Sequence, residues 1–346
     1  MNGHLTRRRC YTNLAVISLT RRNFLAVAGA GALGGCRCTE PAPPPSSAWR
    51  AGPAAPYSTQ EIYPALHQNA IWVAGGFSTE AGGATERVVA FDLDKQAWSE
   101  KRALPTPSHH VQLATLGDRL MAIGGFVGGD SRTRWICTAR VLVLEGDRWV
   151  EGPALPRPIG EAVPLSHEGR VHLIGGRSPR GEANAEWKDH ADVDDHWVLE
   201  GTDQKWRRAA PLPRARNSAA GAVLAGALHV ISGRTVGAAP TAGHHVYDPR
   251  TDTWRDGEPF PEPRGGLAAA TWRGRVVAGG GEVFEPPSVG ASLYELDGGG
   301  AWRRIDTLPT PRHGHGFVSA GEALYVVGGA REPSAEGTLA RVDVIR

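Results

Sequence analysis

A short apolar run that ends in a pair of glycines recurs along this chain, and this recurrence limits the fold more than any other feature. Four of the runs are NAIWVAGG from Asn69, DRLMAIGG from Asp118, GRVHLIGG from Gly169 and EALYVVGG from Glu322. The pairs begin at Gly75, Gly124, Gly175, Gly280 and Gly328, and Ser232-Gly233 takes the same place in ALHVISG. Short runs rich in branched and aromatic residues are typical of strands buried on both faces.

A second set of residues repeats in step with the glycine pairs. Tryptophans recur at intervals of 51, 57, 48 and 48 residues, at Trp98, Trp149, Trp206, Trp254 and Trp302. Six residues after each of them stands a Leu or Phe followed by Pro. Each unit is therefore predicted to hold a strand, a second strand ending in the glycine pair, a loop, a third strand, a turn and a fourth strand opening with Trp. The 45 Gly and 26 Pro also favour many short strands joined by turns.

A period near 50 residues with these marks resembles the Kelch repeat, which forms one blade of a β-propeller. The resemblance covers Trp49 to Arg346 and implies an all-β fold, a six-bladed Kelch-type β-propeller. The last unit stops after its third strand and has no Trp, whereas Trp49 stands 49 residues before Trp98 without a unit of its own. We therefore expect the N-terminal strand to complete the last blade and close the ring, which removes exposed sheet edges. Residues 49–346 form the predicted propeller.

The first 36 residues are predicted to be an export signal. Arg21-Arg22 precedes a mild apolar run that ends at Cys36, which resembles a bacterial twin-arginine signal. The run is shorter than the roughly 20 apolar residues that span a bilayer. Leu33-Gly34-Gly35-Cys36 resembles a lipobox, which implies lipidation of Cys36, with ordinary cleavage nearby as the alternative. Residues 37–48 then form a Pro-rich tether, and we expect a periplasmic protein that meets the membrane only through this lipid anchor.

The charge and the cysteines of the body exclude two classes of protein. The leader holds five Arg and no acid, which leaves 33 basic against 36 acidic groups in the rest of the chain. A body with that balance and no long basic run has no electrostatic footprint for nucleic acid. Only Cys137 lies in the body, so no disulfide framework forms there, and a buried inert thiol is the favoured interpretation.

Candidate binding residues follow the Leu-Pro turns, on the face that also carries the loops between second and third strands. Arg216, Arg264 and Arg312 stand ten residues after their tryptophans. Polar residues come directly after this position in several units: His109, His110, Glu161, Asn217, His313 and His315. Together they could hold a carboxylate or a sugar at the mouth of the channel. In the alternative interpretation, the arginines bond loop carbonyls or an acid of the next blade.

The longest loop, residues 177–195, is a candidate for binding Ca²⁺ or another divalent ion. It offers six carboxylates and His190, but it lacks the glycine-punctuated spacing of a calcium loop. A solvated, mobile, charged loop is therefore the favoured interpretation, and the sequence predicts no metal site and no cofactor.

Three functions remain open at this point, and the sequence favours the first. A non-catalytic module would bind a protein or carbohydrate at the channel mouth. An enzyme of the sialic-acid mutarotase type would use Glu161 or His313 for proton transfer and Arg216, Arg264 or Arg312 for the sugar carboxylate. An oxidase like galactose oxidase needs two Tyr, two His and a Tyr–Cys crosslink around copper. Tyr247, Tyr294 and Tyr325 fall at repeated strand positions and Cys137 has no evident Tyr partner, which disfavours the oxidase.

Overall fold

A computed structural model describes residues 48–128 and 134–346 of the chain. The predicted leader, the lipidation site at Cys36 and all of the tether except Ala48 lie outside these residues. Within the described ranges the helical structure is one short 3₁₀ helix, η1 (Trp187–Asp189), and no helix is long and apolar enough to cross a bilayer. The prediction of an all-β fold is confirmed.

Six four-stranded antiparallel sheets form the framework of the described residues. Each of the first three is one continuous piece of chain. The first holds β2 (Ala65–His67), β3 (Ala70–Ala74), β6 (Val88–Asp92) and β7 (Ala97–Glu100). The second holds β9 (Gln112–Leu116), β10 (Arg119–Ile123), β13 (Val141–Glu145) and β14 (Arg148–Glu151). The third holds β15 (Val163–His167), β16 (Arg170–Ile174), β19 (His196–Leu199) and β20 (Arg207–Arg208).

The last three sheets repeat the order, with one exception at the chain ends. The fourth holds β21 (Ala220–Leu224), β22 (Ala227–Ile231), β23 (His244–Asp248) and β24 (Thr253–Asp256). The fifth holds β25 (Ala268–Trp272), β26 (Arg275–Gly279), β29 (Ser292–Leu296) and β30 (Trp302–Thr307). The sixth holds β31 (Gly316–Ala320), β32 (Ala323–Val327), β33 (Val342–Ile345) and, from the other end of the chain, β1 (Arg50–Ala51). Arg50 pairs with Val344 and Ala51 with Asp343.

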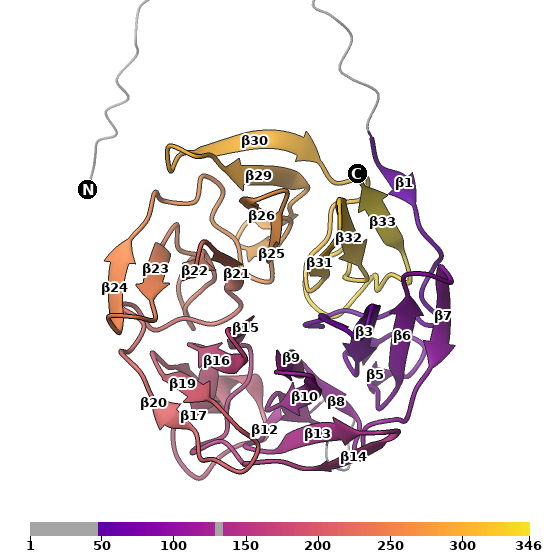
Figure 1. Ribbon diagram of the computed structural model, residues 1–346, viewed down its shortest axis with the longest axis vertical. Coiled ribbons are helices and arrows are strands. Elements are labelled where there is room, and N and C mark those ends of the chain that lie inside the picture. The colour runs from indigo at the N-terminus through magenta and orange to yellow at the C-terminus, as the bar shows by residue number, and fades with distance from the viewer. Residues whose placement is uncertain (1–47, 129–133) are drawn as a thin grey trace, which may run out of the picture. The chain divides into compact units, whose positions relative to one another are not determined.

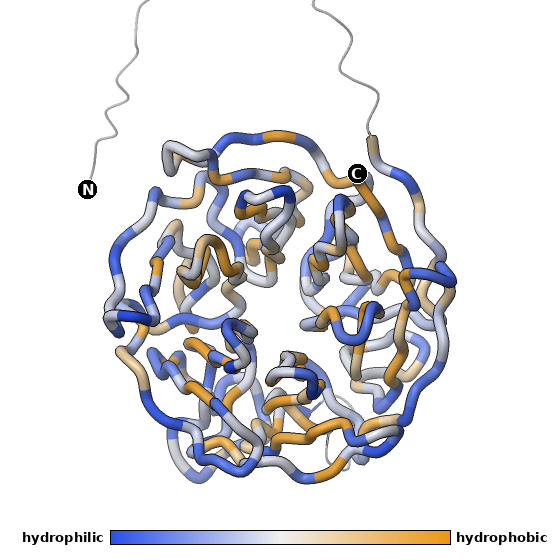
Figure 2. Tube along the Cα trace, viewed as in Figure 1, coloured by the Kyte–Doolittle hydropathy of each residue, from blue (hydrophilic) through white to orange (hydrophobic). Residues whose placement is uncertain are grey.

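The sheets stand around a common centre, with each first strand innermost and each fourth strand at the rim (Figure 1). Hydrophilic residues follow much of the rim (Figure 2), and the fourth strands β7 and β24 are largely exposed. The apolar core is divided among the interfaces between sheets. Within the described residues, six clusters of buried side chains each join two neighbouring sheets, and one of them joins the sixth sheet to the first.

The loops between second and third strands carry small sheets of their own. These are β4 (Phe77–Ser78) with β5 (Gly83–Ala84), β11 (Phe126–Val127) with β12 (Ile136–Cys137) and β8 (Ser108–His109), β17 (Arg177–Pro179) with β18 (His190–Asp192), and β27 (Glu282–Phe284) with β28 (Pro287–Val289). The structure of the loop at 177–195 differs from the predicted solvated, mobile, charged loop. Its two strands and η1 fold it back on itself, and Arg177, His190 and Asp195 are buried, so it is not simply a solvated charged loop.

The glycine pairs are explained by one hydrogen bond between neighbouring sheets. The amide of the second glycine donates to the carbonyl ten residues after the repeat tryptophan of the next sheet, with Trp49 serving the last unit. The six bonds run from Gly76 to Ser108, Gly125 to Ile159, Gly176 to Arg216, Gly233 to Arg264, Gly281 to Arg312 and Gly329 to Thr59, at 2.8 to 3.0 Å. A Cβ on the first glycine would meet that same carbonyl, at 2.4 Å for Gly75 and 2.3 Å for Gly124. Where Ser232 replaces the first glycine, its Oγ lies 3.0 Å from the Arg264 carbonyl oxygen.

The repeated tryptophans link the same neighbours. Each indole N–H donates to a backbone carbonyl four residues after the preceding repeat Trp: Trp98 to Pro53, Trp149 to Arg102, Trp206 to Pro153, Trp254 to Ala210 and Trp302 to Glu258, at 2.7 to 3.0 Å. Their rings therefore bridge consecutive sheets near the rim, as the glycine pairs do near the centre.

Replacing Gly176 by Ala tests the close backbone contact at the second glycine of the pair. The new Cβ would lie 2.6 Å from the Gly160 carbonyl oxygen at a φ of +98°, so the variant combines backbone strain with a clash. Gly226→Ala is the matched control, because its φ is +79° and no atom lies within 4 Å of the new Cβ. We expect a loss of unfolding free energy of about 1 to 2 kcal/mol for the control and about 1 to 3 kcal/mol more for Gly176→Ala. Urea unfolding of both variants checks this, and equal losses would contradict it.

Candidate functional site

Six equivalent residues face one another at the centre of the sheets. Each stands 12 residues after a tryptophan of the repeat, and each has a φ between +50° and +64°: Glu61, His110, Glu161, Ser218, Gly266 and Gly314. We call this set the inner ring. Four of its members carry side chains in the left-handed region that favours glycine, which costs about 1 to 3 kcal/mol each and is common at functional sites.

Backbone hydrogen bonds connect most of the inner ring. The amide of His110 donates to Glu61, that of Ser218 to Glu161, that of Gly266 to Ser218 and that of Gly314 to Gly266, at 2.8 to 3.1 Å. These bonds tie one sheet to the next and fix where each side chain begins. The polar side chains of the ring are therefore held at the centre by backbone that belongs to different sheets.

A second set of residues reaches the centre from the loops, directly after the glycine pairs. It consists of Phe77, Phe126, Arg177, Arg234, Glu282 and Ala330. Each pairs in antiparallel fashion with the residue that precedes an inner-ring member, such as Arg177 with Gly160, Arg234 with Asn217 and Glu282 with Gly265. This pairing brings two arginines and one glutamate to the ring.

Glu161 is the centre of a buried charged network. Its Oε1 lies 3.2 Å from Nη1 of Arg177, its Oε2 lies 3.8 Å from Nη2 of Arg234, and it accepts a hydrogen bond from Ser218. The Glu161 and Arg177 side chains are fully buried. Burial acts to raise the pKa of Glu161, but Arg177, His110 and Arg234 outweigh it and hold that pKa below its usual range. Glu161 therefore stays ionised.

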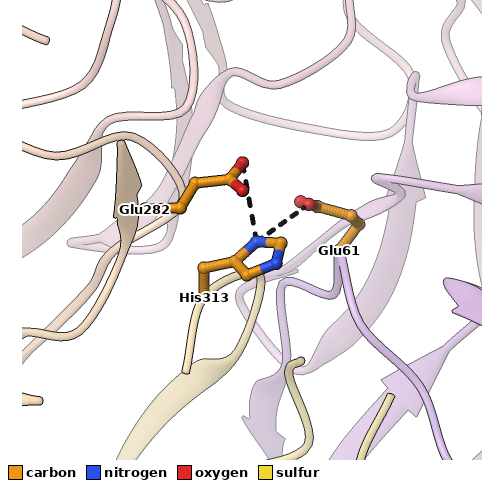
Figure 3. A group of neighbouring side chains, drawn as sticks. All are labelled: Glu61, Glu282 and His313. Atoms are coloured by element: carbon orange, nitrogen blue, oxygen red, sulfur yellow. Dashed lines mark ion pairs between the residues drawn. The ribbon is translucent and has the colours of Figure 1, made fainter. Parts of the chain in front are cut away.

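Glu61, Glu282 and His313 form a second cluster beside this network (Figure 3). Nδ1 of His313 lies 3.5 Å from Oε1 of Glu61 and 3.6 Å from Oε1 of Glu282, and its Nε2 is hydrogen-bonded to the Glu332 carbonyl oxygen at 2.8 Å. Glu282 Oε1 is also 2.7 Å from Nη1 of Arg234. Burial lowers the pKa of His313, but the two carboxylates overcome this and raise it above the usual value.

His109 and His110 continue the cluster on the side of the first two sheets. Nε2 of His110 lies 2.9 Å from Oε2 of Glu61, and the Nδ1 atoms of the two histidines share a hydrogen bond of 2.7 Å. His109 stacks on Phe77 with ring centroids 4.0 Å apart. Burial, with His110 beside it, lowers the pKa of His109 to about 3, so this imidazole is neutral.

A cavity of about 700 Å³ opens above these groups. Its aromatic lining comes from the loops: Phe77, Trp135, Trp187 and Phe284. Its charged lining is Glu61, Arg234, Glu282 and Glu336. The Arg177 guanidinium lies beneath the Trp187 ring at 4.0 Å, and that of Arg234 lies against the Phe284 ring at 4.6 Å. The cavity thus has aromatic walls and a floor that carries both signs of charge.

Five of the nine predicted binding residues meet at this centre: His109, His110, Glu161, Asn217 and His313. Asn217 supports the network from behind, because its Oδ1 lies 3.0 Å from Oγ of Ser218 and accepts from Arg234 at 3.3 Å. Its Nδ2 donates to Asp192 of the 177–195 loop. That loop therefore contributes Arg177 and a hydrogen-bond partner, while the described carboxylates and histidines close enough to share an ion are Glu61, Glu282 and His313.

The other four predicted residues lie apart from this centre, and none of the nine lines the cavity itself. Arg216 donates to the carbonyls of Arg214 and Val230, and Arg312 pairs with Asp343 of its own sheet. Arg264 pairs with Glu262 and contacts Ser288. His315 is buried beside Phe317, and burial holds its pKa well below the usual value. The arginines bond carbonyls or acids, as in the alternative interpretation, but the acid of Arg312 comes from its own sheet.

Residues weighed for an oxidase or a nucleophile also lie apart from the cavity lining. Tyr247 donates to Asp252, and Tyr325 packs near Phe91. Cys137 is buried, its backbone exchanges hydrogen bonds with the Asn184 side chain, and burial raises the pKa of its thiol. A thiol in that state is a poor nucleophile.

Sequence reasoning missed Arg177, Arg234, Glu282 and Glu61, although the repeat carried the signal for each. The first three share the position after the glycine pair, which Phe or Ala occupies in the other units. Glu61 shares the position 12 residues after a tryptophan with His110 and Glu161. Aligning the six units on both landmarks would have placed all of these residues in one ring.

Comparison with known proteins supports the Kelch resemblance. No family model matches the chain. Human Kelch-like protein 34 is 30% identical over 195 residues, which is 53% of this chain and 29% of that protein. A Kelch repeat-containing protein of Arabidopsis thaliana is 26% identical over 200 residues, which is 56% of this chain and 44% of that protein. The chain thus spans less than half the length of these two curated relatives.

A solved structure gives the fold itself. The structure titled "Structure of YjhT" superposes with a TM-score of 0.72 at 15% identity, and the match covers 85% of this chain and 99% of the other. Together with the Kelch relatives, this likeness supports a Kelch-type β-propeller fold.

Replacing Glu161 by Gln tests the buried network. Glu161→Gln removes the charge that faces two buried arginine side chains, and we expect a loss of about 3 to 5 kcal/mol in unfolding free energy at pH 7. Because the pKa of Glu161 is lowered in the folded state, its stabilisation is present above the unfolded pKa of about 4.3 and is lost as pH falls through the folded value.

Urea unfolding between pH 7 and pH 3 measures this effect. The wild type should lose stability more steeply than Glu161→Gln as the pH falls below about 4.3. Parallel pH profiles for the two proteins would contradict the assignment of this buried carboxylate as ionised.

Proposed function

We propose that the six sheets are the blades of a six-bladed Kelch-type propeller, closed by β1. Three observations support this. The strand order of the sixth sheet is β1-β33-β32-β31. The hydrogen bond from the second glycine recurs between the sixth sheet and the segment before the first, from Gly329 to Thr59 at 2.8 Å. A cluster of buried side chains also joins these two sheets.

We further propose that this propeller is a non-catalytic binding module whose ligand is a carbohydrate. The observation that carries this proposal is the cavity of about 700 Å³, with aromatic walls over a charged floor. Its volume lies within the range of about 300 to 1,000 Å³ for small-molecule sites. A sugar presents hydroxyl groups, which need both donors and acceptors, and C–H faces, which pack on aromatic rings.

The cavity offers both kinds of contact. Carboxylates of Glu61 and Glu282 accept hydrogen bonds, and the guanidinium of Arg234 donates them. Trp187 is partly exposed and Phe284 is 47% exposed, so apolar ring surface is available to a ligand. A concave cavity of this volume suits a small ligand better than it suits the flat surface of a protein partner. Because the relatives carry Kelch names, a protein partner is the competing interpretation.

An enzyme of the sialic-acid mutarotase type is the second candidate. It is favoured by the position of His313 between two carboxylates, which suits proton transfer. Arg216, Arg264 and Arg312, which the sequence offered for a sugar carboxylate, do not line the cavity, so Arg234 would have to take that role. His313 and Glu161 do not line it either, and they contact it through the lining residues Glu61, Glu282 and Arg234.

We propose that the chain is exported to the periplasm and anchored there through a lipid on Cys36. The support is the sequence alone: Arg21-Arg22, the short apolar run and the lipobox-like Leu33-Gly34-Gly35-Cys36. A binding module on a Pro-rich tether would then sample ligands near the membrane surface.

A ligand screen tests the binding module. Neutral sugars, uronates and sialic acids are added to the purified chain, and the melting temperature is recorded. A ligand at about 100 times its Kd adds roughly 2.7 kcal/mol of stability. We expect a sugar to raise the melting temperature and Trp187→Ala or Phe284→Ala to weaken its Kd about tenfold, which is about 1.4 kcal/mol.

Ile305→Ala is the matched control for this screen, because Ile305 is also an exposed apolar residue, at 39%, but lies on the outer strand β30. It should leave the Kd unchanged. Proton NMR of each hit separates the two candidates, since a mutarotase would speed exchange between the anomers and a binding module would not. No response to any sugar would favour a protein partner.

Replacing Cys36 by Ala tests the anchor. The wild-type chain, expressed in a bacterium that recognises its signal, should appear in the membrane fraction and incorporate labelled fatty acid. We expect Cys36→Ala to abolish the label and release the chain into the soluble periplasm. Fatty-acid labelling that persists in the variant would contradict lipidation at this residue.

A further inference from the structure

We propose that Glu61, Glu282 and His313 form a binding site for a divalent transition metal ion, with Zn²⁺ as the best match. The three residues come from three different sheets or their entering segments, and their ligand atoms all lie within 4.8 Å of one another (Figure 3). One imidazole nitrogen and two carboxylate oxygens are a donor set that Zn²⁺ accepts in open sites.

The spacing of these atoms suits a shared ion better than a hydrogen bond. Nδ1 of His313 stands 3.5 and 3.6 Å from the two carboxylate oxygens. A charged N–H to carboxylate hydrogen bond is shorter, at about 2.7 to 2.9 Å. Ligand atoms about 2.1 Å from a tetrahedral ion lie about 3.4 Å apart. The His313 side chain is fully buried, and its Nδ1 has no hydrogen-bond partner although it points at both carboxylates.

Every one of the three ligands is oriented by a group behind it. Nε2 of His313 is hydrogen-bonded to the Glu332 carbonyl, which leaves Nδ1 for the ion. Oε2 of Glu61 lies 2.9 Å from Nε2 of His110 in an ion-pair contact, which leaves Oε1. Glu282 receives Nη1 of Arg234 on Oε1 and the amide of Ser334 on Oε2, at 2.7 and 2.9 Å. Supporting bonds of this kind fix the tautomer and direction of metal ligands.

Electrostatics also allow an ion here. Three carboxylates, from Glu61, Glu161 and Glu282, share the centre with the two guanidinium groups of Arg177 and Arg234. Oε1 of Glu282 has more than one lone pair, so it can accept a hydrogen bond from Arg234 and bind an ion at the same time. Glu61 and Glu282 line the cavity, and the ion would therefore keep at least one coordination position open to it.

Titration of the full chain with Zn²⁺ alone tests this site and does not depend on any sugar. By isothermal titration calorimetry we expect one Zn²⁺ per chain, bound at least tenfold more weakly by His313→Gln and by Glu282→Gln. Glu336→Gln is the matched control: its carboxylate lines the same cavity but lies outside the cluster, so binding should be unchanged. The absence of stoichiometric binding, or equal binding by all variants, would overturn the proposal.

A second measurement covers the case in which the variants do not fold. X-ray absorption of the Zn²⁺-loaded wild-type chain should show one imidazole and otherwise oxygen ligands. Scattering from sulfur at about 2.3 Å would place the ion on cysteines, of which the chain has Cys10, Cys36, Cys38 and Cys137, and would overturn the assignment. Failure of the sugar screen would leave this result unaffected.

Discussion

The hydrogen bond from the second glycine of each pair to the next sheet determines the geometry of the whole body. It is made six times, with donor and acceptor at fixed places in the repeat, and its length varies only between 2.8 and 3.0 Å. The bond needs two backbones in direct contact, and a side chain on the first glycine would collide with the accepting carbonyl. Ser232 takes the place of the first glycine in the fourth sheet. Its hydroxyl donates a hydrogen bond to the same carbonyl, whereas an apolar side chain would only collide with it.

Backbone contact at this radius decides what happens closer to the centre. In every unit the residue after the accepting carbonyl pairs in antiparallel fashion with the residue after the glycine pair, which brings these positions together beside the inner ring. The charged residues here are fully or partly buried: Glu161 and Glu282 pair with Arg177 and Arg234, and Glu61 pairs with His110 and His313. A buried ionic network of this kind is usually no more stabilising than apolar packing. Two of its members, Glu61 and Glu161, also have a backbone in the left-handed region, a form of strain that is common at functional sites.

The repeat made much of the fold predictable, because strands, turns and close contacts follow from local patterns. The period, the tryptophans and the glycine pairs gave the four-strand unit, and the lone Trp49 indicated that β1 pairs with β33. The charged residues at the floor of the cavity were harder to predict from the sequence. Arginine was expected at the position ten residues after Trp, but there the backbone carbonyl accepts the inter-sheet bond and the side chain turns back into its own sheet, as for Arg216 and Arg312. The arginines of the centre enter from the loops, at Arg177 and Arg234.

The site itself lies outside the reach of any local motif, since its residues meet only when the sheets surround one centre. Glu61 precedes the first sheet, Glu282 follows a glycine pair in the fifth, and His313 precedes the sixth, so more than 200 residues separate the first from the others. The scaffold repeats while these positions vary: Phe77 and Phe126 occupy the places that Arg177, Arg234 and Glu282 take in other units. Aromatic rings thus fill one side of the centre, and Gly265, Gly266 and Gly314 leave the other side without bulk. The charged cluster arises from this departure from symmetry, and Glu61 lies next to His313 in a ring that the pairing of the two chain ends completes.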